Sequence, residues 1–223
     1  MAQPHSGPTN DGGAPFDVIV TGAELVATLN ADRDEIPGGW VAVRDGRIAA
    51  VGLPGHEPPA RQVVRANGCL VTPGLVNTHH HIYQNLTRSF GPALGGGLFD
   101  WLRTLYPVWS RLDEEAAYVS AWIGLAELVL GGCTTSTDHL YVHPRGGGDL
   151  ISAEIRAAQE LGLRFHPTRG SMSLSVKDGG LPPDSVVQDD DDILADSERL
   201  VRLHHDRSDG AMIRIGLEIG RAH

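Results

Sequence analysis

Cysteine is scarce in this sequence, because Cys69 and Cys133 are the only two in 223 residues. Two cysteines are too few for the disulfide framework on which many small secreted proteins depend. Each begins a predicted strand, a position typical of a small buried side chain. Residues 1–15 have neither a basic start nor an apolar stretch, so they are no secretory signal. We therefore predict a disordered leader over residues 1–15 and a cytoplasmic protein with two buried cysteines.

Long apolar runs and an excess of positive charge are lacking too. No segment reaches the length of about 18 apolar residues that a membrane-spanning helix needs. The 28 acidic residues outnumber the 18 lysines and arginines, which gives a formal net charge of −10. That charge disfavours nucleic-acid phosphates and anionic membranes, so we expect no nucleic-acid and no membrane partner. The glycine runs 95–97 and 146–148 lack the lysine or the spacing of a phosphate-binding loop, and we predict flexible loops there.

The first part of the chain has the pattern of a small antiparallel β unit. Residues 16–29 alternate between apolar and polar positions, as a half-buried strand does. Asp45-Gly46 separates two short apolar runs at 40–44 and 47–51. An Asp-Gly pair in that position is typical of a two-residue hairpin turn. We predict that residues 16–68 form a small β domain.

From residue 69 onward, apolar strands alternate with helical segments. Each helix has an acidic residue at its start, and the helices that begin at 113 and 149 end at glycines, as capped helices do. Such alternation predicts right-handed parallel βαβ units and an α/β fold. Four strands fit either an open doubly wound sheet or half of an eight-stranded barrel. The predicted strands are 69–76, 133–138, 163–168 and 212–217, and the main helices are 113–131, 149–161 and 189–205.

The segment at residues 71–81, VTPGLVNTHHH, reads as a buried strand that ends in three histidines. Side chains two positions apart on a strand point the same way, so His79 and His81 can direct their imidazoles at one point. Imidazole nitrogens are common ligands of zinc and neighbouring transition metals. His80 faces the other way, and we expect it to pack or to support the pair. Two histidines do not close a metal site, so further ligands must come from elsewhere.

Other titratable residues are predicted to lie where the next strands end. Asp138 and His139 end the second strand, and His166 and Arg169 close the third. In a parallel barrel the carboxyl ends of the strands meet at one rim, where catalytic groups lie. Taken singly, His166 is equally well explained as a core histidine whose nitrogens are hydrogen-bonded. Asp138 is explained as a residue that caps a turn. Together these residues predict a site at that rim.

The segment PGLVNTHHH at residues 73–81 resembles the amidohydrolase superfamily, in its cytosine deaminase and chlorohydrolase branch. The resemblance covers residues 16–217. It includes Gln84, three places after His81, and the segments LFDWL at 98–102 and GCTTSTD at 132–138.

A narrower resemblance concerns the substrate. The segments RGSMSLS at 169–175 and DGGLPPD at 178–184 are similar to those of 8-oxoguanine deaminases, which are close relatives of s-triazine aminohydrolases. The resemblance implies hydrolytic deamination of an aminated heterocycle, first of all 8-oxoguanine, with release of urate and ammonia. An s-triazine aminohydrolase or chlorohydrolase is the alternative within the enzymes, and a non-catalytic truncated remnant is the alternative from another class.

The resemblance also implies an architecture and a cofactor. The family fold is a distorted (β/α)8 TIM-type barrel with a small β-sandwich built from both chain ends. Residues 69–223 would be the N-terminal half of that barrel, with about four strands, preceded by part of the sandwich at 16–68. One zinc ion per subunit is expected, although iron occurs in some relatives. His79 and His81 match the first two metal ligands.

Three residues match family positions that contact the heterocycle, namely Gln84, Trp101 and Arg169. The remaining ligands and a glutamate proton shuttle normally follow on strands five, six and eight. The resemblance further implies a small-molecule heterocyclic substrate and a full-length relative that is a homo-oligomer. We interpret this chain as truncated soon after Leu217, and expect it by itself to be inactive and prone to aggregate.

Overall fold

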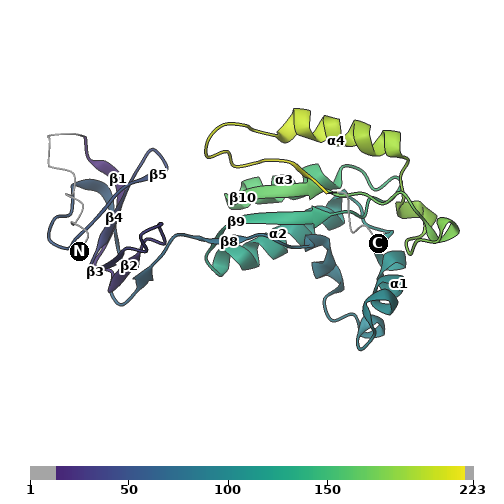
Figure 1. The fold of residues 1–223 in the computed structure, drawn as a ribbon, viewed down its shortest axis with the longest axis horizontal. Coiled ribbons are helices and arrows are strands. Elements are labelled where there is room, and N and C mark those ends of the chain that lie inside the picture. Colours follow the sequence, from purple (N-terminus) through teal and green to yellow (C-terminus); the bar gives the residue numbers. More distant parts are fainter. Residues whose placement is uncertain (1–13, 219–223) are drawn as a thin grey trace. The chain divides into compact units, whose positions relative to one another are not determined.

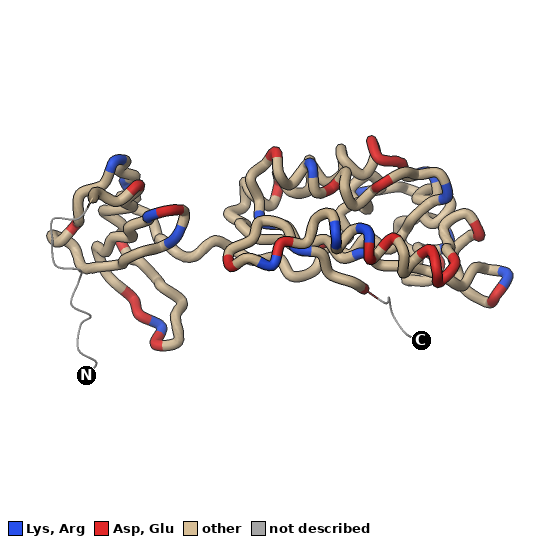
Figure 2. The backbone as a smooth tube through the Cα atoms, turned by 90° about the horizontal axis from the view of Figure 1, so that it is seen from above, with Lys and Arg blue, Asp and Glu red and all other residues tan. Residues whose placement is uncertain are grey.

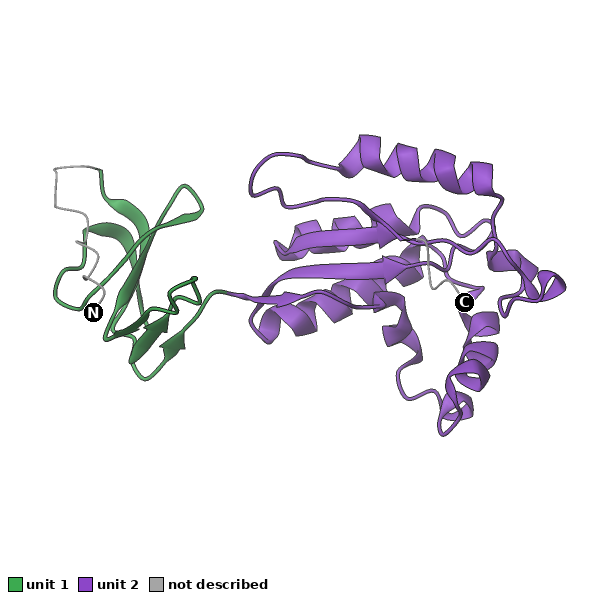
Figure 3. Cartoon of the chain, in the orientation of Figure 1, with its two compact units in different colours: residues 1–73 green, residues 74–223 purple. Residues whose placement is uncertain are grey.

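The computed structural model describes residues 14–218 of the chain. Most of the leader predicted at 1–15 therefore lies outside the described residues. The chain divides into two compact units, residues 1–73 and residues 74–223 (Figure 3). Acidic and basic residues are interspersed along the backbone of both units (Figure 2). No helix in the described part of the chain is long and apolar enough to cross a membrane.

The first unit contains two small β-sheets. One has the strand order β5-β4-β1-β6, and the other has the order β3-β2-β7. In the larger sheet β1 pairs antiparallel with β4 and parallel with β6. Trp40 is buried in this sheet, and its indole Nε1 donates a 2.8 Å hydrogen bond to the Leu53 carbonyl. The strands are β1 (Phe16–Thr21), β2 (Leu25–Ala27), β3 (Glu35–Pro37), β4 (Trp40–Arg44), β5 (Arg47–Gly52), β6 (Ala60–Arg65) and β7 (Leu70–Val71).

The hairpin predicted around Asp45-Gly46 is confirmed. Arg44 pairs with Arg47 in the antiparallel ladder of β4 and β5, which leaves a two-residue loop. Asp45 has φ of 51° and Gly46 has φ of 71°. Two successive positive φ angles define a type I′ turn, whose twist matches that of the flanking strands. Asp and Gly are the residues that tolerate this geometry best.

The segment predicted as one strand over residues 69–76 forms two strands, so that prediction is wrong. β7 pairs in parallel with β2 of the first unit, whereas β8 (Leu75–Asn77) pairs with β9 of the second. Pro73 separates them, because proline has no N–H to continue a ladder. Gly74 is needed beside it, since a Cβ there would collide with the Thr134 side chain. The boundary between the units consequently follows residue 73 rather than residue 68.

The two cysteines have different environments. Cys133 is buried, as predicted, at the start of β9. Cys69 is exposed, which contradicts the prediction for it. Its N–H donates to the Ala66 carbonyl in a turn that precedes β7. Cys69 therefore belongs to a connection at the surface and not to the apolar strand that follows.

The second unit contains a four-stranded parallel sheet of order β11-β10-β9-β8 (Figure 1). The strands lie side by side in the order of the sequence. A doubly wound sheet reverses its strand order at a switch point, and no reversal occurs among these four strands. The sheet is therefore part of a (β/α) barrel, and the α/β half-barrel prediction is confirmed. Its strands are β8, β9 (Cys133–Leu140), β10 (Arg164–Arg169) and β11 (Gly216–Leu217).

Helices connect these strands in the expected places. Asp113 caps α2 by accepting from the Ala116 N–H, and Asp149 caps α3 by accepting from the Ser152 N–H. Gly162 ends α3 with φ of 70°, a left-handed conformation that suits glycine. The α-helices are α1 (Leu98–Trp109), α2 (Glu114–Leu130), α3 (Leu150–Leu161) and α4 (Asp190–His204). The 3-10 helices are η1 (Ile82–Thr87), η2 (Gly91–Ala93), η3 (Val176–Asp178) and η4 (Asp184–Val186).

Successive side chains of β9 point to opposite faces of the parallel sheet. Ser136, Asp138 and Leu140 are fully buried and share the face that α2 and α3 cover. Thr137 and His139, on the opposite face, are only half-buried. This second face corresponds to the barrel interior. His139 thereby comes to the same side as the histidines that follow β8.

The covered face should carry most of the stability of the second unit. Leu125 of α2 is 0% exposed in this core, whereas Leu130 of the same helix is 88% exposed. We expect Leu125→Ala to lower the free energy of unfolding by about 2–5 kcal/mol, because it leaves a cavity. Leu130→Ala is the matched control and should change it by less than about 0.5 kcal/mol. Urea denaturation measures both, and equal losses would contradict this placement of the core.

Candidate active site at the carboxyl ends of the parallel strands

Three imidazoles gather at the carboxyl end of the sheet. The His79 and His81 ring centroids lie 5.0 Å apart in an edge-to-face arrangement. The His139 ring of β9 lies 4.6 Å from that of His79 and 5.8 Å from that of His81. His79 and His81 lie in the connection after β8 and not on the strand itself, which ends at Asn77. The structure thus brings together the two histidines predicted to bind metal, with His139 beside them.

His81 is held in an orientation that suits a metal ligand. Its Nδ1 lies 2.7 Å from the His139 carbonyl oxygen, which can only accept a hydrogen bond. Nδ1 therefore carries the proton, and the lone pair of Nε2 is left free. Burial lowers the pKa of His81, partly offset by this hydrogen bond. A neutral imidazole with a free Nε2 is the form that binds zinc.

The described residues supply only part of a metal site. Among residues 14–218, no group of three or more His, Cys, Asp or Glu side chains is placed to hold a metal ion. His79 and His81 fit two positions of such a site by residue type and by the free Nε2 of His81. Their metal-binding role stays a prediction.

Two of the predicted substrate contacts share a cavity with His81. Gln84 and Trp101 line a depression of about 310 Å³ beside it. The Trp101 ring is supported edge-to-face by Trp109, at a centroid distance of 5.2 Å. Sequence reasoning missed Arg88, which lines the same cavity and donates to Glu127 of α2. Its only signal in the sequence is its position four residues after Gln84.

His80 lines the same cavity as His81, so its expected orientation away from the histidine pair stays a prediction. It is half-buried, and its Nδ1 has no hydrogen-bond partner among the described residues. Burial lowers the pKa of His80, and the neighbouring His81 adds to this. His80 also borders the cavity of Gln84 and Trp101. It is therefore a neutral neighbour of the pair.

Arg169 has a different role from the predicted contact with the heterocycle. Its side chain is 0% exposed and pairs with Asp196 of α4, with Nε at 2.9 Å from the carboxylate. Its other nitrogens donate to the Gly170 carbonyl and the Gln188 side chain, both at 2.7 Å. A guanidinium held in this way joins the end of β10 to α4. The physical reason is that β10 turns Arg169 toward the helical layer and away from the histidines.

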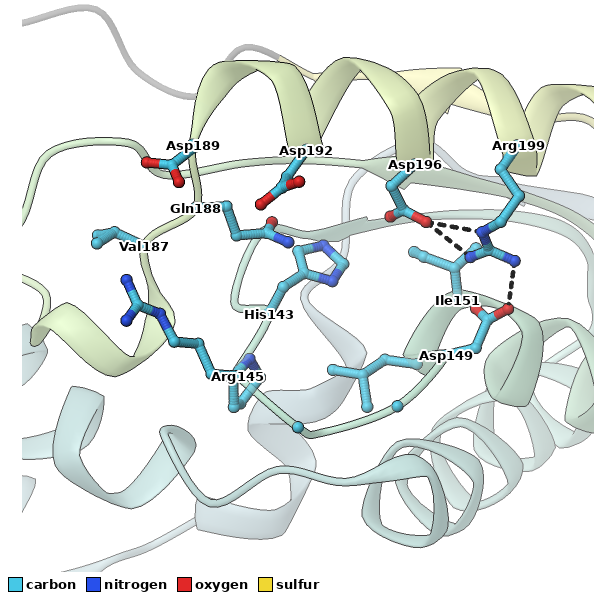
Figure 4. A pocket seen from close by; sticks show the side chains of 14 residues that line it. His143, Arg145, Asp149, Ile151, Val187, Gln188, Asp189, Asp192, Asp196 and Arg199 are labelled. Atoms are coloured by element: carbon cyan, nitrogen blue, oxygen red, sulfur yellow. Dashed lines mark hydrogen bonds and ion pairs between the residues drawn. The ribbon is translucent and has the colours of Figure 1, made fainter.

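A larger cavity of about 540 Å³ lies between the loop after β9 and the start of α4 (Figure 4). It contains none of the predicted site residues. Arg199 crosses it to pair with Asp149 at 2.6 Å and with Asp196 at 2.7 Å. Burial lowers the pKa of His143, which lines the cavity, to about 4. These ion pairs tie α3 to α4, so we assign the cavity a structural role.

Two carboxyl groups are buried behind the histidines. Asp138 of β9 and Glu154 of α3 are both 0% exposed. Burial raises the pKa of Asp138 to about 7. Burial and the adjacent Asp138 charge raise the pKa of Glu154 well above its ordinary value. The pair therefore retains a proton at neutral pH, because two adjacent buried carboxylates strongly disfavour each other.

Asp138 was predicted to lie at the site, whereas Glu154 was not. A signal for it was present, because Glu154 lies on the apolar stripe of α3 beside Ile151, Ile155 and Ala158. Glu154 lies three residues after Ile151 and therefore on the same face of the helix. Because that face packs against the core, the Glu154 carboxyl group must be buried there. Its partner, however, depends on how α3 packs against β9.

Comparisons with known proteins agree with this fold. Residues 70–218 match the amidohydrolase family. An 8-oxoguanine deaminase from Pseudomonas aeruginosa is 48% identical over 194 residues, which are 86% of this chain and 43% of that protein. A hydroxydechloroatrazine ethylaminohydrolase from Pseudomonas sp. strain ADP is 39% identical over 212 residues, 90% of this chain and 43% of that protein. The chain thus spans less than half the length of these relatives.

Solved structures of related enzymes have a similar fold. An atrazine chlorohydrolase from Arthrobacter aurescens TC1, complexed with zinc, has a TM-score of 0.84 and 26% identity over 90% of this chain and 46% of its own. Guanine deaminase from E. coli has a TM-score of 0.70 at 22% identity over 88% of this chain and 45% of its own, a likeness of fold alone.

The buried Glu154 should make stability depend on pH. The unfolded carboxyl releases its proton near pH 4.5, whereas the folded one keeps it. At this site the folded chain then binds more protons, so the contribution of Glu154 to the unfolding free energy falls as pH rises, by at most about 1.4 kcal/mol per pH unit. We expect Glu154→Gln to gain stability relative to the unchanged chain between about pH 5 and pH 7.

Urea denaturation at several pH values checks this expectation. Glu160→Gln, at an exposed position of the same helix, is the control and should show no such trend. A difference between Glu154→Gln and the unchanged chain that does not vary with pH would show that Glu154 is ionised in the folded state.

Proposed function

Because this chain belongs to the amidohydrolase family, we propose that it carries the first part of the active site of a metal-dependent aminohydrolase. The observation that carries the proposal is the pairing of His79 and His81 at the carboxyl end of β8, with the Nδ1 of His81 held by the His139 carbonyl. In a barrel of this kind, that end of the sheet is where catalysis occurs.

His79 and His81 would hold the metal, and zinc is the ion we propose because it is present in the related chlorohydrolase structure. The chemistry that a bound zinc ion supplies in such sites is the activation of water at neutral pH. The chain's own part is to present neutral imidazoles. The hydrogen bond of His81 to the His139 carbonyl keeps Nε2 unprotonated for this purpose.

The cavity beside His81 would bind the heterocycle. The indole of Trp101 offers an aromatic surface for a flat ring, and Trp109 fixes its orientation. The amide of Gln84 can donate to a ring carbonyl and accept from a ring N–H. Arg88, whose guanidinium is paired with Glu127, lines the same wall. The cavity therefore has the groups to orient an oxygenated nitrogen heterocycle.

We propose 8-oxoguanine as the substrate. The reaction is hydrolytic: the oxygen of water forms a bond to the ring carbon, the bond from that carbon to the exocyclic nitrogen breaks, and ammonia leaves. The product is urate. Support for this choice comes from the relative at 48% identity, which is named as an 8-oxoguanine deaminase. The substrate would thus be a small molecule and not a nucleic acid.

A second candidate substrate is an aminated or chlorinated s-triazine. It is favoured by the triazine-acting relative at 39% identity and by the chlorohydrolase with a TM-score of 0.84. Both rings are flat, nitrogen-rich and compatible with Gln84 and Trp101. The two candidates share the same chemistry at the carbon that loses its substituent, so they differ only in which ring the cavity accepts.

A chimeric enzyme distinguishes these substrates. The matching 43% of the Pseudomonas aeruginosa 8-oxoguanine deaminase would be replaced by this chain's residues, and ammonia release from 8-oxoguanine would be compared with amine release from an N-alkylated hydroxytriazine. We expect the chimera to prefer 8-oxoguanine, with kcat/KM within about tenfold of the parent. The reciprocal chimera, in the triazine-acting relative, is the control. Preference for the triazine in both chimeras would refute the 8-oxoguanine proposal.

The 223-residue chain alone should release no ammonia from 8-oxoguanine when zinc is added at one ion per chain. The physical reason is that the described residues bring together fewer than three candidate metal ligands. A sensitive coupled assay for ammonia checks this. Turnover by the isolated chain would contradict it and would also exclude the reading of this chain as a non-catalytic remnant.

The two proposed metal ligands can be tested in the chimera against the histidine between them. We expect His79→Ala and His81→Ala each to lower bound zinc below about half of the parent value and to abolish deamination, because either leaves a ligand position open. His80→Ala should retain zinc, since His80 is not one of the two proposed ligands. Metal analysis of the purified proteins gives the answer, and an equal loss of zinc in all three variants would contradict the assignment.

A further inference from the structure

We propose that Asp138 is a positioning residue for His81: its buried carboxylate binds the peptide N–H that follows His81 and so fixes the imidazole for metal binding. This inference rests on the proposed function, because it takes His81 as a metal ligand. Asp138 does not touch the imidazole itself. It acts through the backbone of Ile82.

Three hydrogen bonds join residues 80–82 to the end of β9. The Ile82 N–H donates to Asp138 Oδ1 at 2.6 Å. The His139 N–H donates to the His80 carbonyl at 2.9 Å. His81 Nδ1 donates to the His139 carbonyl at 2.7 Å. The backbone on both sides of His81, and its ring, are thus held by two consecutive residues of one strand.

These three hydrogen bonds hold the chain beyond the point where the pairing between β8 and β9 ends. The ladder between β8 and β9 stops at Asn77 and Ser136, so the histidines lie beyond the last paired residue of β8. A connection at that point is free to take several conformations unless other bonds hold it. A short hydrogen bond from an N–H group to a carboxylate is among the stronger hydrogen bonds that a protein chain can form. Asp138 therefore supplies order where the sheet no longer does.

Asp138 is itself held by β10 and lies next to a second buried acid. Thr168 of β10 donates its hydroxyl to the Asp138 carbonyl at 2.9 Å. Glu154 of α3 lies behind the Asp138 side chain, and both of its oxygens are buried without a hydrogen-bond partner among the described residues. Burial and the charge of Asp138 raise the pKa of Glu154, so Glu154 stays protonated. A neutral Glu154 adds no negative charge of its own beside Asp138, whose Oδ1 accepts from the Ile82 N–H.

A matched control exists on the other side of the same residue. Ser120 of α2 is 0% exposed, and its hydroxyl donates to the Ile82 carbonyl at 2.6 Å. Ser120→Ala removes a buried hydrogen bond of similar length to Ile82, but from the side that faces away from His81. A general loss of packing would affect both variants, whereas loss of positioning should affect only Asp138→Ala.

The experiment uses the 223-residue chain and two readouts. Nitrogen-15 NMR of the His81 ring reports which nitrogen carries the proton, and hydrogen exchange of the Ile82 amide reports its protection. For Asp138→Ala we expect a mixture of His81 tautomers and at least tenfold faster exchange at Ile82. Ser120→Ala should keep the Nδ1–H tautomer. Asp138→Asn retains an acceptor oxygen of the same shape and should largely restore the tautomer.

Zinc titration of the same variants, each made in the chimera that supplies the remaining metal ligands, adds a functional readout. Asp138→Ala should weaken zinc binding by about tenfold or more, as the loss of residues behind metal-bound histidines typically does, while Ser120→Ala should leave it within about twofold. If Asp138→Ala and Ser120→Ala shift the tautomer and the zinc affinity equally, or neither shifts them, the positioning role is refuted. If the unchanged chimera binds no zinc but Asp138→Ala alone disturbs the tautomer in the 223-residue chain, the positioning inference holds and the proposed metal site fails.

Discussion

The attachment of residues 80–82 to the end of β9 is the constraint on which the candidate site depends. β8 is only three residues long, and its ladder ends before the histidines begin. Without the bonds from Asp138 and His139, the connection that carries His79 and His81 would have no fixed relation to the sheet. The site is therefore built by the neighbouring strand as much as by the strand that precedes it.

That arrangement follows from the period of two in β9. Asp138 points into the helical layer and His139 points to the opposite face. Two consecutive residues therefore place one side chain on each side of the sheet. The buried side receives a carboxyl that can reach around to the Ile82 amide. The open side receives an imidazole that joins the histidine cluster. A shift of one residue in the register of β9 would exchange these two roles.

Much of the fold could be predicted from local sequence, because local rules decide it. The Asp45-Gly46 turn and the Asp149 cap each depend on a few adjacent residues, and both formed as expected. The errors concern residues whose role depends on distant partners. Arg169 was expected to face a ligand, but it pairs with Asp196, which lies 27 positions later. Residues 69–76 were expected to form one strand, but they pair with two different sheets.

The sequence by itself determined the chemistry that is available: a pair of histidines two positions apart, a nearby glutamine and tryptophan, and strands that alternate with capped helices. Only the tertiary structure decided which groups meet. It placed His139 beside the histidine pair, gave Glu154 a buried acid as its neighbour, and turned Arg169 into the helical layer. The physical reason is that residue type and periodicity set the face on which a side chain lies, whereas contacts between distant segments arise only when the helices and strands pack.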